Sequence, residues 1–223
     1  MICSGRDKIE TPEQFKQAKE IVQKLDLDGL VVIGGDDSDT NAGLLVEHFM
    51  RENMKTRVIG CPKTIDASHI TLECALQTHP NITIIREEGA VSRFGYEERC
   101  GLPTNFDSTY CYALGFDAAT LLQSGKTGLI SSVGNLCAPI EEWTVDGTAL
   151  TSFVDMERRH GEFKPMIKKA MVELEGAPFK KFSSLRDEWA LKNFYINPGP
   201  IQFIGPGSDA ISHTLLLELG AEA

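Results

Sequence analysis

One short apolar run that ends in two glycines limits the fold of this chain more than any other part of its sequence. Leu30–Ile33 is rich in β-branched residues, Gly34-Gly35 follows directly, and the next residues have the composition of a helix. Such a run is typical of a strand that is buried on both faces of a parallel sheet. A second apolar strand is expected at Arg57–Cys61, again after a helical segment. Strands that alternate with helices in this way indicate an α/β fold with a parallel, Rossmann-like sheet.

Apolar residues that recur at helical spacing predict the helices of this fold. The first helix has Thr11 in the N-cap position, Pro12 in its first turn and Gln14 in a capping box. Glycine and proline mark where the elements end. Helices are expected at about 11–24, 41–53, 67–77, 108–123, 163–174 and 184–193, and strands at 29–33, 57–61, 82–85 and 129–133.

Charge and composition exclude several classes of protein. The 223 residues include 22 Lys and Arg against 32 Asp and Glu, a net charge of −10, whereas nucleic-acid binding needs a surplus of clustered cations. The apolar runs are far shorter than the ~20 residues that cross a bilayer. The six cysteines form no Cys-x-x-Cys pair, and Met1–Asp7 contains no apolar signal core. We therefore expect a cytoplasmic protein with neither a nucleic-acid partner nor a membrane partner.

The segment from Gly34 to Thr40 lies between the first strand and the next helix, at the sheet edge where ligands bind in open α/β folds. Its glycines allow the close approach of a phosphate, and the helix offers free N–H groups to an anion. Carboxylates beside such an anion would repel it unless a cation lies between them. Asp36 is therefore a candidate ligand of Mg²⁺, which commonly uses one or two carboxylates together with phosphate oxygens. The alternative is a tight strand–helix turn in which one of residues 37–39 is an ordinary N-cap.

A second polar segment follows the next strand and therefore reaches the same edge of the sheet. Pro62-Lys63-Thr64-Ile65-Asp66 supplies a cation, a hydroxyl group and a carboxylate. Phosphoryl transfer needs this combination, because a positive charge must lie beside the transferred group and a base must orient the attacking hydroxyl. The alternative of two solvated turns is weakened because the two segments follow consecutive strands.

The two motifs together, Gly34–Ser38 and Pro62–Asp66, resemble those of the phosphofructokinase family. Within this family the chain is similar to the pyrophosphate-dependent enzymes, and among these to the catalytic beta subunit of the plant type. The resemblance includes Phe94–Arg99 and extends over nearly the whole chain. It implies a fold of the phosphofructokinase type, here incomplete. It also implies reversible transfer of a phosphoryl group from pyrophosphate to the 1-hydroxyl of fructose 6-phosphate, a step of glycolysis.

The resemblance implies roles for four residues around the phosphoryl donor. Asp36 matches the family's Mg²⁺-binding aspartate. Asp37 matches a position where ATP-using relatives carry glycine, so that its carboxylate would take the place of the ATP α-phosphate. Lys63 matches the lysine that stabilises the transition state when pyrophosphate is the donor. Asp66 matches the general base that accepts the proton of the sugar hydroxyl.

The resemblance also implies where the acceptor sugar binds. Tyr96 and Arg99 match the pair that holds its 6-phosphate, and an arginine fork suits that group. Two residues depart from the family pattern, since Glu98 replaces a glycine and Asp39 replaces a neutral asparagine. The full set of expected substrate-binding residues is Thr64, Ile65, Asp66, Tyr96, Glu97, Glu98 and Arg99.

Several segments of the family pattern are missing. The family continues after the aspartate with Gly-Asp-Leu, whereas here Asp66 is followed by Ala67-Ser68-His69. The family's Met-Gly-Arg and Pro-Glu-Gly substrate segments and its early glycine-rich diphosphate loop are not found. We therefore expect a donor and Mg²⁺-binding segment at 1–66, a remnant of the acceptor domain at 67–94, and a C-terminal α/β segment at 95–223 that carries the sugar 6-phosphate motif.

Three functions remain open at this point. The first is the pyrophosphate-dependent reaction, with Mg²⁺ as the cofactor and a regulatory alpha subunit as the partner in a hetero-oligomer. The second is a catalytically impaired fragment that at most associates with other subunits, because positioning accounts for much of phosphoryl-transfer catalysis and positioning segments are missing. The third is an ATP-dependent 6-phosphofructokinase, against which the carboxylate of Asp37 argues.

Overall fold

The structure is a computed structural model that describes residues 8–63, 68–83, 103–159, 161–167, 172–197, 205 and 213–221. The chain forms two compact units, and each is assembled from three segments. The first unit comprises Met1–Thr64, Tyr110–Gly134 and Trp143–Lys168. The second comprises Ile65–Thr109, Asn135–Glu142 and Lys169–Ala223.

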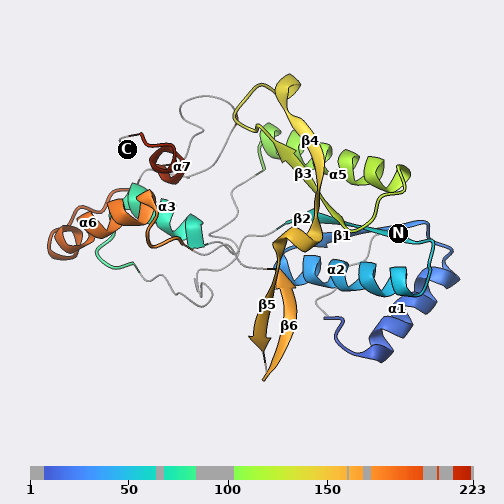
Figure 1. The fold of residues 1–223 in the computed structure, drawn as a ribbon. Coiled ribbons are helices and arrows are strands. Elements are labelled where there is room, and N and C mark those ends of the chain that lie inside the picture. The colour runs from blue at the N-terminus through green and yellow to red at the C-terminus, as the bar shows by residue number, and fades with distance from the viewer. Residues whose placement is uncertain are drawn as a thin grey trace. The chain divides into compact units, whose positions relative to one another are not determined.

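The first unit is built on a four-stranded sheet (Figure 1). The strands β1 (Gly29–Gly34), β2 (Arg57–Pro62) and β3 (Leu129–Gly134) pair in parallel, while β4 (Thr144–Ala149) pairs antiparallel with β3. Because β1 and β2 are in register up to the pair Gly34–Pro62, they end at the same edge of the sheet. The expected α/β fold class with a parallel sheet is thus confirmed. The spatial order of the strands is β1, β2, β3 and β4.

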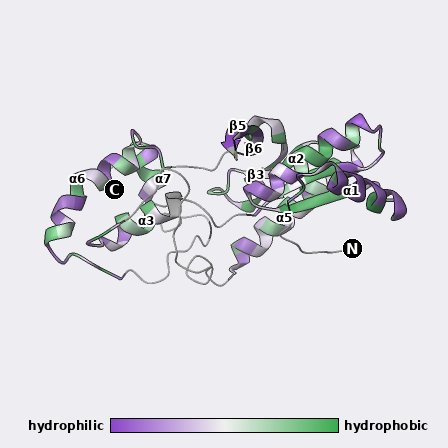
Figure 2. Cartoon of the chain, turned by 90° about the horizontal axis from the view of Figure 1, so that it is seen from below, coloured by the Kyte–Doolittle hydropathy of each residue, from purple (hydrophilic) through white to green (hydrophobic). Residues whose placement is uncertain are grey.

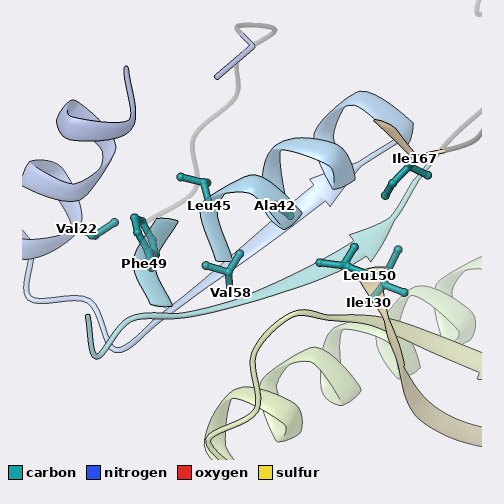
Figure 3. Packing of buried hydrophobic residues seen from close by; sticks show 8 residues of the cluster. All are labelled: Val22, Ala42, Leu45, Phe49, Val58, Ile130, Leu150 and Ile167. Atoms are coloured by element: carbon teal, nitrogen blue, oxygen red, sulfur yellow. The ribbon is translucent and has the colours of Figure 1, made fainter. Parts of the chain in front are cut away.

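Helices α1 (Pro12–Lys24) and α2 (Asp36–Arg51) contribute to the main apolar core on one face of this sheet (Figure 3). The expected capping box of α1 is present: the Gln14 N–H donates to Thr11 Oγ1 over 3.3 Å, and the Thr11 N–H donates to Gln14 Oε1 over 3.0 Å. Most of α1 is hydrophilic in Figure 2, as expected for a helix that contacts the core along one stripe. The core consists of Val22, Ala42, Leu45, Phe49, Val58, Ile130, Leu150 and Ile167.

Helix α5 (Asn105–Gln123) lies on the opposite face of the sheet. Alternation along β1 distributes its side chains between the two faces, since Leu30 and Val32 contact the α2 core whereas Gly29 lies against Leu122 of α5. A Cβ at residue 29 would lie 2.9 Å from the Leu122 side chain. The glycine at the start of β1 therefore allows α5 to approach the strand closely.

The helix expected at 41–53 begins earlier than its apolar spacing predicts. α2 starts at Asp36, directly after Gly35 in the N-cap position, so that Asp36, Asp37 and Asp39 all lie in its first turn. Carboxylates in the first turn interact favourably with the positive end of the helix dipole and with its free N–H groups. The acidic run is thus part of the helix and not of a preceding loop.

The helix expected at 163–174 is wrong over its first residues. Glu162–Ile167 forms β6, which pairs antiparallel with β5 (Val154–Arg159). Pairing with β5 and the burial of Met166 and Ile167 at the end of the strand explain the difference, and a two-stranded ribbon tolerates Pro165. Ile167, the last residue of β6, belongs to the apolar core beneath α2.

The second unit contains a small helical core. α3 (Ser68–Thr78), α6 (Ala177–Leu191) and the short α7 (His213–Glu218) pack through Leu72, Ala75, Leu76, Phe182 and Trp189. α6 begins before the expected helix at 184–193, and α7 is not anticipated by the sequence analysis. The strand expected at 82–85 extends outside the described residues, and Ile82 and Thr83 are not in a strand. Among the described residues, no helix has the length and apolar character needed to cross a membrane.

Candidate active site at the edge of the parallel sheet

The structure brings the two polar segments together where β1 and β2 end. The backbone N–H of Lys63 donates to the carbonyl oxygen of Gly34 over 2.6 Å, one residue beyond the paired strands. Asp36 and Asp37 follow Gly34 by two and three residues and occupy the first turn of α2. A cationic side chain and two carboxylates thus extend from one edge of the sheet.

Three of the expected site residues can be described individually. Asp36 is half-buried, Asp37 is exposed and forms an ion pair with Lys8 at 3.2 Å, and Lys63 is exposed. An exposed lysine at this edge is accessible to an anionic ligand. The other expected residues, Thr64, Ile65, Asp66, Tyr96, Glu97, Glu98 and Arg99, lie outside the described residues, and their roles remain predictions.

Thr40 fixes the first turn of α2. Its Oγ1 donates to the carbonyl oxygen of Asp36 over 2.6 Å and accepts a hydrogen bond from the Ile167 N–H at 3.0 Å. One buried hydroxyl therefore joins the turn that carries the carboxylates to the last residue of β6. Thr40 was not among the expected site residues; its place four residues after Asp36, one helical turn away, is the signal that could have indicated it.

Asp39 is buried, with 5% of its surface exposed. Burial, and to a smaller degree the neighbouring Asp36 carboxylate, raises the pKa of Asp39 to about 7. Asp39 Oδ1 has no hydrogen-bond partner among the described residues. This carboxyl group therefore holds its proton much longer than an ordinary aspartate as pH rises. The sequence contained a sign of its burial, because Asp39 lies three residues before the buried Ala42 and so on the inner face of the helix.

The residues at this edge are compatible with Mg²⁺ bound together with a phosphate ligand. In the described part of the chain, no group of three or more His, Cys, Asp or Glu side chains could hold a metal ion by itself. Mg²⁺ commonly binds through one or two carboxylates plus phosphate oxygens, which is what Asp36 beside an anion site would offer.

Comparisons with known proteins agree with the motifs. Residues 1–76 match the family model described as Phosphofructokinase. The beta 2 subunit of pyrophosphate–fructose 6-phosphate 1-phosphotransferase from Arabidopsis thaliana is 46% identical over 404 residues, an alignment that covers 100% of this chain and 71% of that protein. The beta subunit from Ricinus communis is 45% identical over 404 residues, and this alignment covers 100% of this chain and 73% of that protein. The Treponema pallidum enzyme of the same name is 30% identical over 415 residues.

This chain is shorter than the parts of its plant relatives with which it aligns. The alignments extend over 404 positions in the plant relatives, whereas this chain has 223 residues, so these relatives contain internal segments that have no counterpart here. A solved structure of a pyrophosphate-dependent phosphofructokinase from Marinobacter aquaeolei has a TM-score of 0.47 and 12% identity, and covers 92% of this chain and 77% of that one. A likeness this weak carries no argument about the fold. The sequence identities to the plant beta subunits, by contrast, show that this chain belongs to the pyrophosphate-dependent phosphofructokinase family.

Proposed function

We propose that this chain catalyses the reversible transfer of a phosphoryl group from pyrophosphate to the 1-hydroxyl of fructose 6-phosphate. The observation that carries the proposal is the hydrogen bond between the Lys63 N–H and the Gly34 carbonyl, which brings the lysine to the edge where Asp36 and Asp37 begin α2. The named activity of the relatives supports the same reaction. The protein would then act in glycolysis, in the cytoplasm.

Each of the site residues would have a separate role in the reaction. Asp36 would hold Mg²⁺, which when bound offsets the charge of the donor phosphates. Asp66 would accept the proton of the sugar hydroxyl as its oxygen forms the new P–O bond, and the bond to the departing phosphate breaks. The Lys63 ammonium would stabilise the charge that develops on the transferred and departing oxygens. Tyr96 and Arg99, with Glu97 and Glu98 between them, would hold the 6-phosphate, and Thr64 and Ile65 would contact the substrates.

Donor choice would depend on Asp37. A carboxylate in the first turn of α2 occupies the end of the helix that would otherwise bind an anion through its N–H groups. A nucleotide with its α-phosphate at this place would meet both the volume and the charge of the carboxylate. Pyrophosphate has no such group and avoids the conflict. This argues against the ATP-dependent alternative.

A coupled assay tests the reaction. The purified chain is supplied with fructose 6-phosphate, pyrophosphate and Mg²⁺, and formation of the bisphosphate is followed beside that of Asp66→Asn and of the control Lys16→Met. We expect turnover that falls by about 10²–10⁴-fold in Asp66→Asn and is unchanged in Lys16→Met. A small effect of Asp66→Asn would contradict the assignment of the base. Lys16 is suited as a control because it lies on the exposed side of α1.

A second candidate function is association without catalysis. The observation that favours it is the excess of internal positions in the relatives, 404 against 223, because losing substrate-positioning segments can slow the reaction by many powers of ten. Relatives with the same enzyme name are called beta subunits and, in one case, an alpha subunit, so a hetero-oligomer with an alpha subunit is the assembly to test. Co-elution with an alpha subunit in size-exclusion chromatography, together with no turnover, would support this candidate over the first.

A further inference from the structure

We infer that Lys8 is a positioning residue for Asp37, and that the donor selectivity expected of Asp37 depends on this ion pair. Lys8 Nζ lies 3.2 Å from Asp37 Oδ1. The inference rests on the proposed function and deepens it, because it concerns how the same site would distinguish pyrophosphate from a nucleoside triphosphate. Within the described part of the chain, the contact with Lys8 is the one ion pair that Asp37 forms.

The segment that carries Lys8 is attached to the helix that carries Asp37. The Ile9 N–H donates to Asn41 Oδ1 over 3.3 Å, and the rings of Phe15 and His48 lie 5.2 Å apart between centroids. Asp37, Asn41 and His48 are four and seven residues apart, a spacing that places them along one face of α2. Residues 8–15 therefore follow the face of the helix that begins with Asp37. Lys8 reaches the first turn because its backbone is held there.

Packing does not determine the conformation of the Asp37 side chain. Its side chain is 55% exposed and that of Lys8 is 45% exposed. Both border a cavity of about 240 Å³ beside α2, which is also lined by Asn41, Leu44 and Met166. An aspartate beside open space can adopt several rotamers, so the ion pair is the interaction that favours one of them.

The ion pair should therefore affect which anions the site accepts. With Lys8 in place, the carboxylate is held at the start of α2, where it obstructs the α-phosphate of a nucleotide. Without Lys8, the carboxylate can leave this position for other rotamers that point to solvent, and it obstructs the nucleotide less. An exposed ion pair corresponds to about a two- to fivefold effect on an equilibrium constant.

A double-mutant cycle measures this dependence. The affinity of the full chain for ATP in the presence of Mg²⁺ is determined by calorimetry for the unchanged protein, Asp37→Gly, Lys8→Met and the double variant. We expect Asp37→Gly to increase ATP affinity, and we expect this gain to be about two- to fivefold smaller when Lys8 is already replaced by methionine. Lys8→Arg, which can keep the ion pair, should restore the full gain. Lys16→Met removes a charge from the exposed side of α1 and should leave the gain unchanged.

Two results would overturn the inference. A gain from Asp37→Gly that is equal or larger in the Lys8→Met background would mean that Lys8 contributes charge only. No gain from Asp37→Gly in either background would mean that Asp37 does not exclude nucleotides. The proposed function is tested separately, by binding of pyrophosphate with Mg²⁺ to the unchanged chain. An additive cycle with pyrophosphate binding intact counts against Lys8 alone, whereas absent pyrophosphate binding counts against the proposed reaction.

Discussion

Asp39 and Gly60 share one space between α2 and β2, since Asp39 Oδ1 lies 3.0 Å from the point where a Cβ at residue 60 would be placed. The same Cβ would lie 3.3 Å from Ile130 and 3.5 Å from Leu150, so the buried carboxyl group is not the only neighbour that would have to move. The absence of a side chain at residue 60 therefore allows an acidic residue to be buried beneath the candidate site.

Gly60→Ala should destabilise the first unit by about 1–3 kcal/mol, because the added methyl group overpacks a buried position. The free energy of unfolding in urea measures this effect. Gly43→Ala is the matched control within α2, where an added Cβ meets no atom within 4 Å. An alanine in that helix position should instead stabilise the protein by about 0.5–1 kcal/mol. Equal effects of the two changes would contradict the packing argument.

Asp39→Asn should change how stability depends on pH. Because burial raises the pKa of Asp39 to about 7, the folded state binds a proton that the unfolded state has released above pH ~4. The stability that this protonated carboxyl group contributes is therefore fully present below pH ~4, and it is lost as pH rises toward and through about 7. The neutral amide introduced by the substitution has no such loss. The free energy of unfolding of Asp39→Asn, relative to that of the unchanged protein, should therefore increase by about 1–3 kcal/mol from pH 5 to pH 8. Urea unfolding at each pH measures this difference. A constant difference across this range would show that Asp39 does not titrate there.

Thr40→Val should destabilise the first unit by about 1–3 kcal/mol, because it leaves the Ile167 N–H without its buried acceptor and removes the bond to the Asp36 carbonyl. Thr40→Ser keeps the hydroxyl and should recover most of this loss. Hydrogen exchange at the Ile167 amide is the direct measurement, and we expect it to be faster in Thr40→Val than in Thr40→Ser. Unchanged exchange would mean that the hydroxyl is not its acceptor in solution.

Glu73→Gln should loosen α7 from α3. Glu73 accepts hydrogen bonds from the His213 N–H at 2.9 Å and from the N–H and hydroxyl of Thr214, both at 2.8 Å. Burial opposes ionisation of this carboxylate, but hydrogen bonds from Thr214, Gln77 and His213 outweigh it and lower its pKa. The attachment should therefore weaken as pH falls below ~4.5. Hydrogen exchange of the α7 amides at pH 7 should be faster in Glu73→Gln, while exchange in α2 should not change.

Lys63→Met should lower kcat for the pyrophosphate reaction by about 10²–10³-fold with a smaller change in KM, because its ammonium would act on charge that develops in the transition state. The coupled assay measures both constants. Lys126→Met removes a lysine near the other end of the sheet, where the turn after α5 leads into β3, and should leave both constants unchanged. A rise in KM at constant kcat would assign Lys63 to substrate binding alone.

The parallel sheet could be predicted because its signal is local. Leu30–Ile33 and Arg57–Cys61 are apolar along almost their whole length, a composition typical of strands in a parallel sheet. Burial on both faces is confirmed for β2, whereas it is wrong for β1, in which Val31 is 37% and Ile33 is 68% exposed. The adjacency of the two site segments followed from the parallel sheet, since parallel strands end at one edge. The capping box of α1 involves Thr11 and Gln14 only, and it too was predicted correctly.

The features that could not be predicted depend on contacts between distant parts of the chain. The β5–β6 hairpin contains apolar residues that also suit a helix, and its strands are fixed by their pairing with each other and by the position of Ile167 in the core. The burial of Asp39 depends on the absence of a side chain at Gly60 on another strand. The short helix α7 depends on Glu73, which lies about 140 residues earlier in the chain.

The bond between Thr40 and Ile167 sets the order in which the candidate site can be completed during synthesis. The two residues are 127 positions apart, so the ribosome has made most of the chain before Ile167, whose N–H donates to the Thr40 hydroxyl, emerges. Contacts with such a large separation form late and slowly, because a long loop has to close first. β1, β2 and α2 can associate early, but the turn that carries Asp36 and Asp37 gains its last restraint only when β6 arrives. A nascent chain would thus acquire its donor site as one of its final steps of folding.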